Sequence, residues 1–217
     1  MMIESYAVTP SIFGVANSAS MNATGQVSPG EIISLVGSNL GPSNPVTASL
    51  AGGQQAISSQ LGGVQMLFDG VAAPLLYVSS TQINATVPFG TADRTDTKMV
   101  FHNAGASSNE ALLGVVPAAP AVFVTQATNH YLPVAAALNE DGSINSPTNR
   151  AAPGSIISIF ATGCGALAPQ PADGSVVSLP LPELEQNIDM FGPGFIQVLY
   201  AGAAAGRRRH ASQLPFA

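Results

Sequence analysis

The stretch PGEIISLVGSNLG, residues 29–41, recurs almost unchanged as PGSIISIFATGCG, residues 153–165. Two further blocks follow each copy in the same order. LLY ends at Tyr77 and VLY at Tyr200, and TQINATVPF is echoed by SQLPF near the end of the sequence. Blocks that keep their order and a near-constant spacing rarely arise by chance. We therefore predict that the chain contains an internal duplication.

Each copy begins with a turn that leads into a strand. Pro-Gly favours a turn, and the isoleucine pair behind it is typical of a short buried strand. Farther along, Val64, Met66 and Phe68 occupy alternate positions, and Asp69-Gly70 supplies a two-residue hairpin turn. A regular alternation of helices and strands is missing, which argues against a parallel α/β sheet. The pattern predicts an all-β protein built as a β-sandwich.

Three other segments complete the expected elements. Residues 97–116 are predicted to form a pair of strands that turn near residues 103–105. Residues 134–146 are predicted to form a hairpin with Asp141-Gly142 at its tip. Only residues 181–187, LPELEQN, have any helical character.

The length of 217 residues suits two domains of about 100 residues each. We predict a first immunoglobulin-like sandwich at residues 1–119 and a second, incomplete one at residues 120–217, joined near residues 117–122. Most of the following side chains are expected to be buried in the first sandwich: Ile32, Ile33, Leu35, Val64, Met66, Phe68, Leu76 and Tyr77.

The charge distribution bears on partners. The net charge is −6, and three of the five arginines are the adjacent Arg207, Arg208 and Arg209. Nucleic-acid binding needs a basic footprint, so this class is disfavoured. No apolar run reaches the ~20 residues of a membrane span. A signal peptide is not recognisable at the start, and the lone Cys164 does not decide the compartment.

Residues with possible chemistry are scattered, and each has an ordinary structural explanation. Asn139, Asp141, Ser143 and Asn145 place oxygens at alternate positions, but the terminal acid of a calcium loop is missing, and a plain hairpin explains them. The other candidates are the histidines His102, His130 and His210, the carboxylate pairs Asp93 with Asp96, Glu140 with Asp141 and Glu183 with Glu185, and the sequons at Asn22 and Asn84. No serine-nucleophile motif and no phosphate-binding loop is present. We therefore predict no catalytic, cofactor-binding or metal-binding residue.

Three longer strings carry a resemblance to a known family: VSPGEIISLVGSNLGP, LGGVQMLFDGVAAPLLYVSSTQINATVPF and AAALNEDGSINSPTNRAAPGSIISIFATGCG. Over residues 14–200 the chain resembles the Solibacter-type uncharacterised C-terminal domain of acidobacterial exported proteins. The halves of that domain are similar to IPT/TIG immunoglobulin-like domains. The resemblance implies tandem sandwiches, a place at the C-terminal end of a larger exported protein, and no assigned catalytic residues.

The chain departs from this pattern after its third block, because the first copy continues with two more strands and the second copy stops at Ala217.

The leading functional hypothesis is a non-catalytic extracellular or cell-surface module that acts as a spacer, an adhesion element or a protein-interaction element. Its partners would be other domains of the parent protein, and protein or glycan at the cell surface. The alternative is a carbohydrate- or ligand-binding accessory module of an exported enzyme, disfavoured by the absence of Trp. An enzyme in its own right ranks last.

Overall fold

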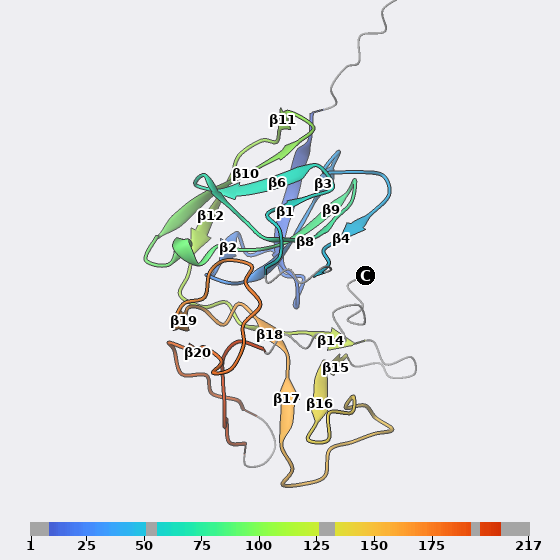
Figure 1. Cartoon of the computed structure of the whole chain (residues 1–217), viewed down its shortest axis with the longest axis vertical. Helices are drawn as coiled ribbons and strands as arrows, with labels where there is room; N and C mark the ends of the chain where they lie inside the picture. The colour runs from blue at the N-terminus through green and yellow to red at the C-terminus, as the bar shows by residue number, and fades with distance from the viewer. Residues whose placement is uncertain (1–8, 51–55, 126–132, 192–195, 205–217) are drawn as a thin grey trace, which may run out of the picture.

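The computed structural model describes residues 9–50, 56–125, 133–191 and 196–204 (Figure 1). Their regular structure is β-strand, apart from one 3-10 turn at Phe89–Thr91. The prediction of an all-β protein is therefore confirmed. A β-sandwich of two sheets occupies the first half of the chain, and short paired strands make up the second half.

The first sheet of the sandwich contains five antiparallel strands in the order β1-β3-β9-β8-β4. Its strand built on the Pro-Gly stretch, β3, lies between β1 and β9 and is therefore paired along both edges. The strands are β1 (Ser11–Asn17), β3 (Ile32–Ser38), β9 (Gln82–Thr86), β8 (Leu75–Val78) and β4 (Val46–Thr47).

The second sheet has the order β2-β12-β10-β6-β5, with β11 added to β10 and β7 added to β6. β2 belongs to this second sheet, so the chain crosses from the first sheet to the second immediately after β1 in the sequence. β2 runs parallel to β12. The strands are β2 (Gln26–Val27), β12 (Ala111–Val115), β10 (Asp96–Asn103), β6 (Val64–Phe68), β5 (Gln60–Leu61), β11 (Ala106–Ser107) and β7 (Val71–Ala72).

The core lies between the two sheets and follows the alternation of side chains along each strand. Along β6, Val64, Met66 and Phe68 are buried and the residues between them are not, as predicted. Three expected core positions are only half-buried: Ile32 at the start of β3, and the neighbouring Leu76 and Tyr77 of β8. An irregularity in the β8–β9 register between residues 75 and 77 turns Leu75 and Val78 inward in place of Leu76 and Tyr77.

The described residues of the second half form four two-stranded sheets: β13 (Ala121–Val122) with β18 (Ala161–Thr162), β14 (Val124–Thr125) with β15 (Val134–Ala135), β16 (Ala137–Asn139) with β17 (Ile157–Ile159), and β19 (Leu167–Ala168) with β20 (Glu183–Leu184). The expected helical character of residues 181–187 is wrong. Glu183 and Leu184 pair with β19 instead, and Leu184 donates its N–H to the Ala201 carbonyl. That this half forms a second sandwich stays a prediction.

Candidate functional site

A row of polar side chains crosses the outer face of the second sheet. Gln60 of β5 lies opposite Gln65 of β6, and Gln65 lies opposite His102 of β10. His102 in turn lies opposite Ser107 of β11. The neighbouring Val64, Met66 and Phe101 point into the core, so these polar side chains point away from it, because successive side chains of a strand alternate in direction.

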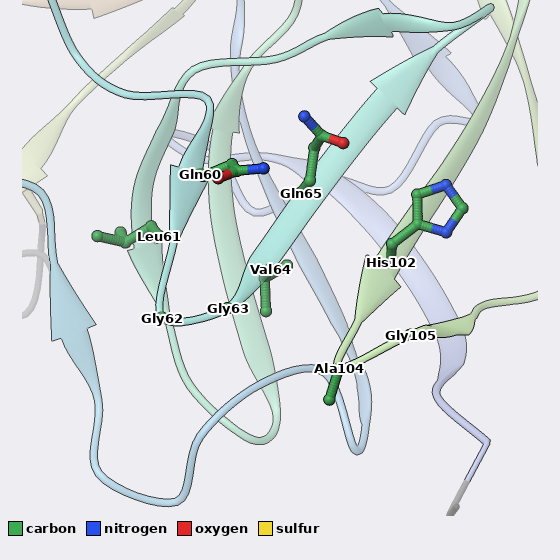
Figure 2. A pocket seen from close by; sticks show the side chains of 9 residues that line it. All are labelled: Gln60, Leu61, Gly62, Gly63, Val64, Gln65, His102, Ala104 and Gly105. Atoms are coloured by element: carbon green, nitrogen blue, oxygen red, sulfur yellow. The ribbon is translucent and has the colours of Figure 1, made fainter.

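The row borders a groove of about 310 Å³ (Figure 2). Two tight hairpin turns form its rims. Gly62 and Gly63 connect β5 to β6, and Ala104 and Gly105 connect β10 to β11. All four turn residues have positive φ angles, which glycine adopts at little cost and which suit two-residue hairpins. The turns therefore leave backbone and small side chains at the rims of the groove.

The groove offers amide, imidazole and hydroxyl groups for hydrogen bonding. His102 Nδ1 is 3.0 Å from the Ser107 hydroxyl oxygen, which leaves its Nε2 available. Within the described residues, the amide groups of Gln60 and Gln65 make no side-chain hydrogen bond. Figure 2 shows both amides and the imidazole standing clear of the strands. Such groups can bind hydroxyl or amide groups of a neutral ligand.

A second polar cluster lies where the sandwich meets the second half of the chain. Glu31 is 1% exposed, although it is charged in water at neutral pH. Its carboxylate accepts the Asn17 side-chain amide at 2.8 Å, the Ser28 N–H at 2.7 Å and the Ser28 hydroxyl at 3.2 Å. Burial raises the pKa of Glu31 above its usual range, and these hydrogen bonds act in the opposite direction.

The members of this cluster also bond directly to the second half. Asn17 donates its side-chain amide to the carbonyl of Ala119, at the entry to the second half, at 3.1 Å. The single proton of the Ser28 hydroxyl is shared between Glu31 and the Gly163 carbonyl oxygen, each at 3.2 Å. The Ile32 N–H donates to the Thr162 hydroxyl oxygen at 2.6 Å. We call these contacts, together with Glu31, the joint. Residues of β1, of β3 and of the turn between β2 and β3 thus hold two separate segments, at Ala119 and at residues 162–163.

A further contact region lies nearby. The Phe89 N–H donates to an Asp173 carboxylate oxygen at 2.8 Å, and the Ile57 N–H donates to the Gly174 carbonyl at 2.8 Å. Ala56 and Ser175 form an isolated β-bridge. A Cβ at Gly174 would lie 2.7 Å from the Ile57 carbonyl oxygen, so the close approach requires glycine there.

The calcium-like segment is a hydrogen-bonded turn. Asp141 Oδ1 accepts the Ser143 N–H at 2.8 Å and the Ser143 hydroxyl at 2.6 Å, and these bonds lower the pKa of Asp141. Asn145 donates its amide to Asn139 Oδ1 at 2.7 Å. These side chains therefore hydrogen-bond within their own turn, and Leu138 bridges to Ile144 as a hairpin requires.

The other sequence candidates are dispersed. His102 joins the polar row, whereas His130, His210 and the three adjacent arginines lie outside the described residues. The paired carboxylates are exposed at Asp93, Asp96, Glu140, Asp141, Glu183 and Glu185. Among the residues that the structure places, no three His, Cys, Asp or Glu side chains gather closely enough to hold a metal ion.

Two remaining candidates have local roles. Cys164 is half-buried with its Sγ 3.9 Å from the Thr162 carbonyl oxygen, and burial raises the pKa of its thiol. Asn22 is exposed, but Asn84 is 5% exposed, and its Oδ1 accepts hydrogen bonds from Ser34 and Gln82. In the folded sandwich the Asn84 sequon is therefore covered.

Sequence reasoning missed both the joint and most of the polar row. Glu31 did carry a signal, because it is an acid placed between a Pro-Gly turn and an apolar strand. Gln60 and Gln65 carried none, because their proximity to His102 depends on the order of strands in the sheet.

No family model and no curated protein matches the chain. Solved structures with a partial likeness to this chain include the following two. An auxiliary nutrient binding protein from Bacteroides thetaiotaomicron is 13% identical, with a TM-score of 0.33 over 52% of this chain and 22% of its own. A gamma-CGTase from alkalophilic Bacillus clarkii is 15% identical, with a TM-score of 0.35 over 76% of this chain and 22% of its own.

In the part of the chain that the structure describes, no helix has the length and hydropathy to cross a bilayer.

Proposed function

We propose that this chain is a non-catalytic, extracellular or cell-surface immunoglobulin-like module at the C-terminal end of a larger exported protein. It serves there as a spacer and a protein-interaction element. The joint is the observation that carries this proposal, because a spacer holds its neighbours at a fixed separation. The resemblance of residues 14–200 to domains of exported proteins supports the location.

The joint has the features of a fixed connection. Glu31 is buried with three donors on its carboxylate, and two of the residues that donate to it, Asn17 and Ser28, also bond across to the second half. Breaking such a network leaves a buried carboxylate without partners, which is costly. The two halves therefore move together and not as independently tethered units.

The backbone at the joint is equally constrained. Gly163 has a φ of +75°, and a Cβ there would overlap the Ala119 carbonyl oxygen. Ala119 in turn donates its N–H to the Gly163 carbonyl at 2.7 Å. Only glycine fits both the conformation and the space, so Gly163 sets the distance between these two segments.

Small-angle X-ray scattering tests the spacer role. Gly163→Ala should open the joint, increase the maximum dimension and make residues 117–122 more sensitive to protease. Gly154→Ala is the matched control, because Gly154 has a similar φ of +82° with nothing within 4 Å of an added Cβ. Identical scattering and proteolysis of the two variants would overturn the proposal.

The second candidate function is the binding of a neutral glycan or similar ligand in the groove. The row of Gln60, Gln65, His102 and Ser107 favours it, since amide, imidazole and hydroxyl groups can hydrogen-bond to hydroxyl-rich ligands. Titration calorimetry with neutral oligosaccharides should give binding that Gln65→Ala abolishes. Leu112→Ala, at an exposed position on the neighbouring β12, should leave that binding unchanged. An absence of heat with every oligosaccharide would remove this candidate.

A further inference from the structure

The two Pro-Gly stretches form the same turn. In the first, the Glu31 N–H donates to the Ser28 carbonyl at 3.1 Å, and in the second the Ser155 N–H donates to the Ala152 carbonyl at 3.1 Å. The glycines have matching φ angles of +72° for Gly30 and +82° for Gly154. These are the features of a turn with proline second and glycine third.

The strands behind the two turns also pair in the same register. In the sandwich, Asn17 of β1 lies opposite Ile33 of β3, followed by Ala16 opposite Ser34 and Val15 opposite Leu35. In the second half, Asn139 of β16 lies opposite Ile157 of β17, followed by Leu138 opposite Ser158 and Ala137 opposite Ile159. β16 and β17 are thus the counterparts of β1 and β3.

The two pairs differ on their other side. β3 is also paired with β9, where Ile33 lies opposite Ala85 and Leu35 opposite Ile83. Within the described residues, β17 is paired with β16 alone. Ile33 is fully buried, whereas Ile157 is 45% exposed. Figure 1 shows β16 and β17 side by side, beyond the strands of the sandwich.

The backbone of β17 points hydrogen-bonding groups at its unpaired edge. Phe160 donates its N–H to the Ala136 carbonyl at 3.0 Å, on the side of β16. Backbone groups alternate between the two edges of a strand, so Ile157 and Ile159 direct theirs the other way. In the sandwich the corresponding edge is closed by β9, and Val87 donates to the Glu31 carbonyl there at 2.8 Å.

We infer that the unpaired edge of β17 accepts an extended strand of another polypeptide, added antiparallel and with the residue pattern of β9. The inference rests on the interaction role proposed above and names the kind of partner. The pairing of β3 with β9 specifies the occupant, since the same turn and the same strand register are completed there by the sequence QINAT. Addition of a strand to an open edge is an established mode of peptide recognition.

A synthetic peptide of residues 80–89, STQINATVPF, tests this on the whole chain. Fluorescence anisotropy of the labelled peptide should show saturable binding. Hydrogen exchange should show that the Ile157 and Ile159 amides become protected when the peptide is added.

Methylated peptides provide the matched control. In the sandwich, the backbone hydrogen-bonding groups of Ile83 and Ala85 in β9 point toward β3, as those of Val87 do. The backbone groups of Asn84, which lies between them, point toward β8. N-methylation at Ile83 and Ala85 should weaken binding about tenfold or more, because two hydrogen bonds are lost. N-methylation at Asn84 should leave binding nearly unchanged.

The sequence SQLPF is this chain's own echo of the β9 block, so it is a competing occupant of the edge. Four outcomes would overturn the inference: no saturable binding, equal effects of the two methylated peptides, protection of β17 without peptide at every protein concentration, or protection of β17 that rises with protein concentration when no peptide is present. The last would show that a second copy of the chain covers the edge. The spacer role is judged separately, by the scattering of Gly163→Ala, so either proposal can fail while the other stands.

Discussion

Ile33 and Ile157 follow the same Pro-Gly turn and face the same partner residue, asparagine, across a strand pair. One is fully buried and the other is 45% exposed. Local sequence therefore sets the turn and the register in both halves of the molecule, because these depend on a few neighbouring residues. Burial depends on whether a second sheet and a further strand cover the pair, and this differs between the halves.

The largest expected contrast is at this isoleucine. Ile33→Ala should lower the free energy of unfolding by about 2–5 kcal/mol, because it leaves a cavity in a closed core. Ile157→Ala should lower it by at most about 1 kcal/mol, since the side chain is already half in solvent. Urea unfolding followed by circular dichroism measures both. Equal losses would mean that the second half has a core as closed as that of the sandwich.

The next contrast concerns the last residue of the two turns, Glu31 in the first and Ser155 in the second. Glu31→Ala removes the acceptor for the Ser28 N–H and the Asn17 amide, and it should cost about 1–3 kcal/mol. Ser155→Ala removes a hydroxyl that bonds only to the Ala152 carbonyl of its own exposed turn, and it should cost less than about 1 kcal/mol. Chemical unfolding of the two variants checks this, and a cost at Ser155 as large as that at Glu31 would contradict the role of the joint.

The pH dependence of stability sharpens the same comparison. Burial raises the pKa of Glu31, so the folded protein binds this proton more tightly than the unfolded chain does. The contribution of Glu31 to stability is therefore most favourable below its unfolded pKa, and it declines as the pH rises through the interval up to the folded pKa. Glu31→Gln should flatten this part of the stability profile, measured as melting temperature against pH. Profiles that remain parallel would show that Glu31 has the same pKa in both states.

The smallest contrast is between two turn aspartates. Asp69 accepts the Thr97 hydroxyl at 2.7 Å and the Lys98 N–H at 3.1 Å, and these bonds lower its pKa. Its contribution is present at neutral pH and is lost as the pH falls through the lowered value. Asp69→Asn should therefore cost under about 1 kcal/mol at pH 7, with little effect near pH 2.

Asp141→Asn is the counterpart in the second half. Asp141 bonds only to Ser143 in its own loop, so its replacement should leave global unfolding unchanged. Thermal unfolding at the two pH values measures both variants. A larger loss at Asp141 than at Asp69 would reverse the expected order of the two halves.

Sequence patterns predicted the strands of the sandwich well because alternation and turn chemistry are local. Val64, Met66 and Phe68 are buried as expected, and Asp69-Gly70 connects β6 to β7. The prediction that Leu76 and Tyr77 are buried failed because an irregularity in the β8–β9 pairing shifts the alternation of side chains. No nearby residue indicates this irregularity in the sequence. The helical character expected for residues 181–187 failed because pairing with β19 outweighs weak propensity.

The sites were harder to predict because they depend on contacts between distant segments. Gln65 meets His102 only through the strand order, and Ser28 meets Gly163 only when the two halves are in contact. The sequence did show that Glu31 interrupts an apolar stretch. It could not show that the carboxylate would be enclosed, because its donors Asn17 and Ser28 are themselves bonded to the distant residues Ala119 and Gly163.

The parallel pairing of β2 with β12 has a mechanical consequence. β2 is the second strand of the sandwich in chain order, and β12 is its last strand before the second half. Gly114 and Val116 donate their N–H groups to the Gly25 and Val27 carbonyls, each at 2.9 Å. A tension that pulls the two ends of the sandwich apart acts along these strands, so it shears their hydrogen bonds together and does not peel them off one at a time. The parallel pair of β2 and β12 thus resists a force applied along the line between the two ends of the sandwich.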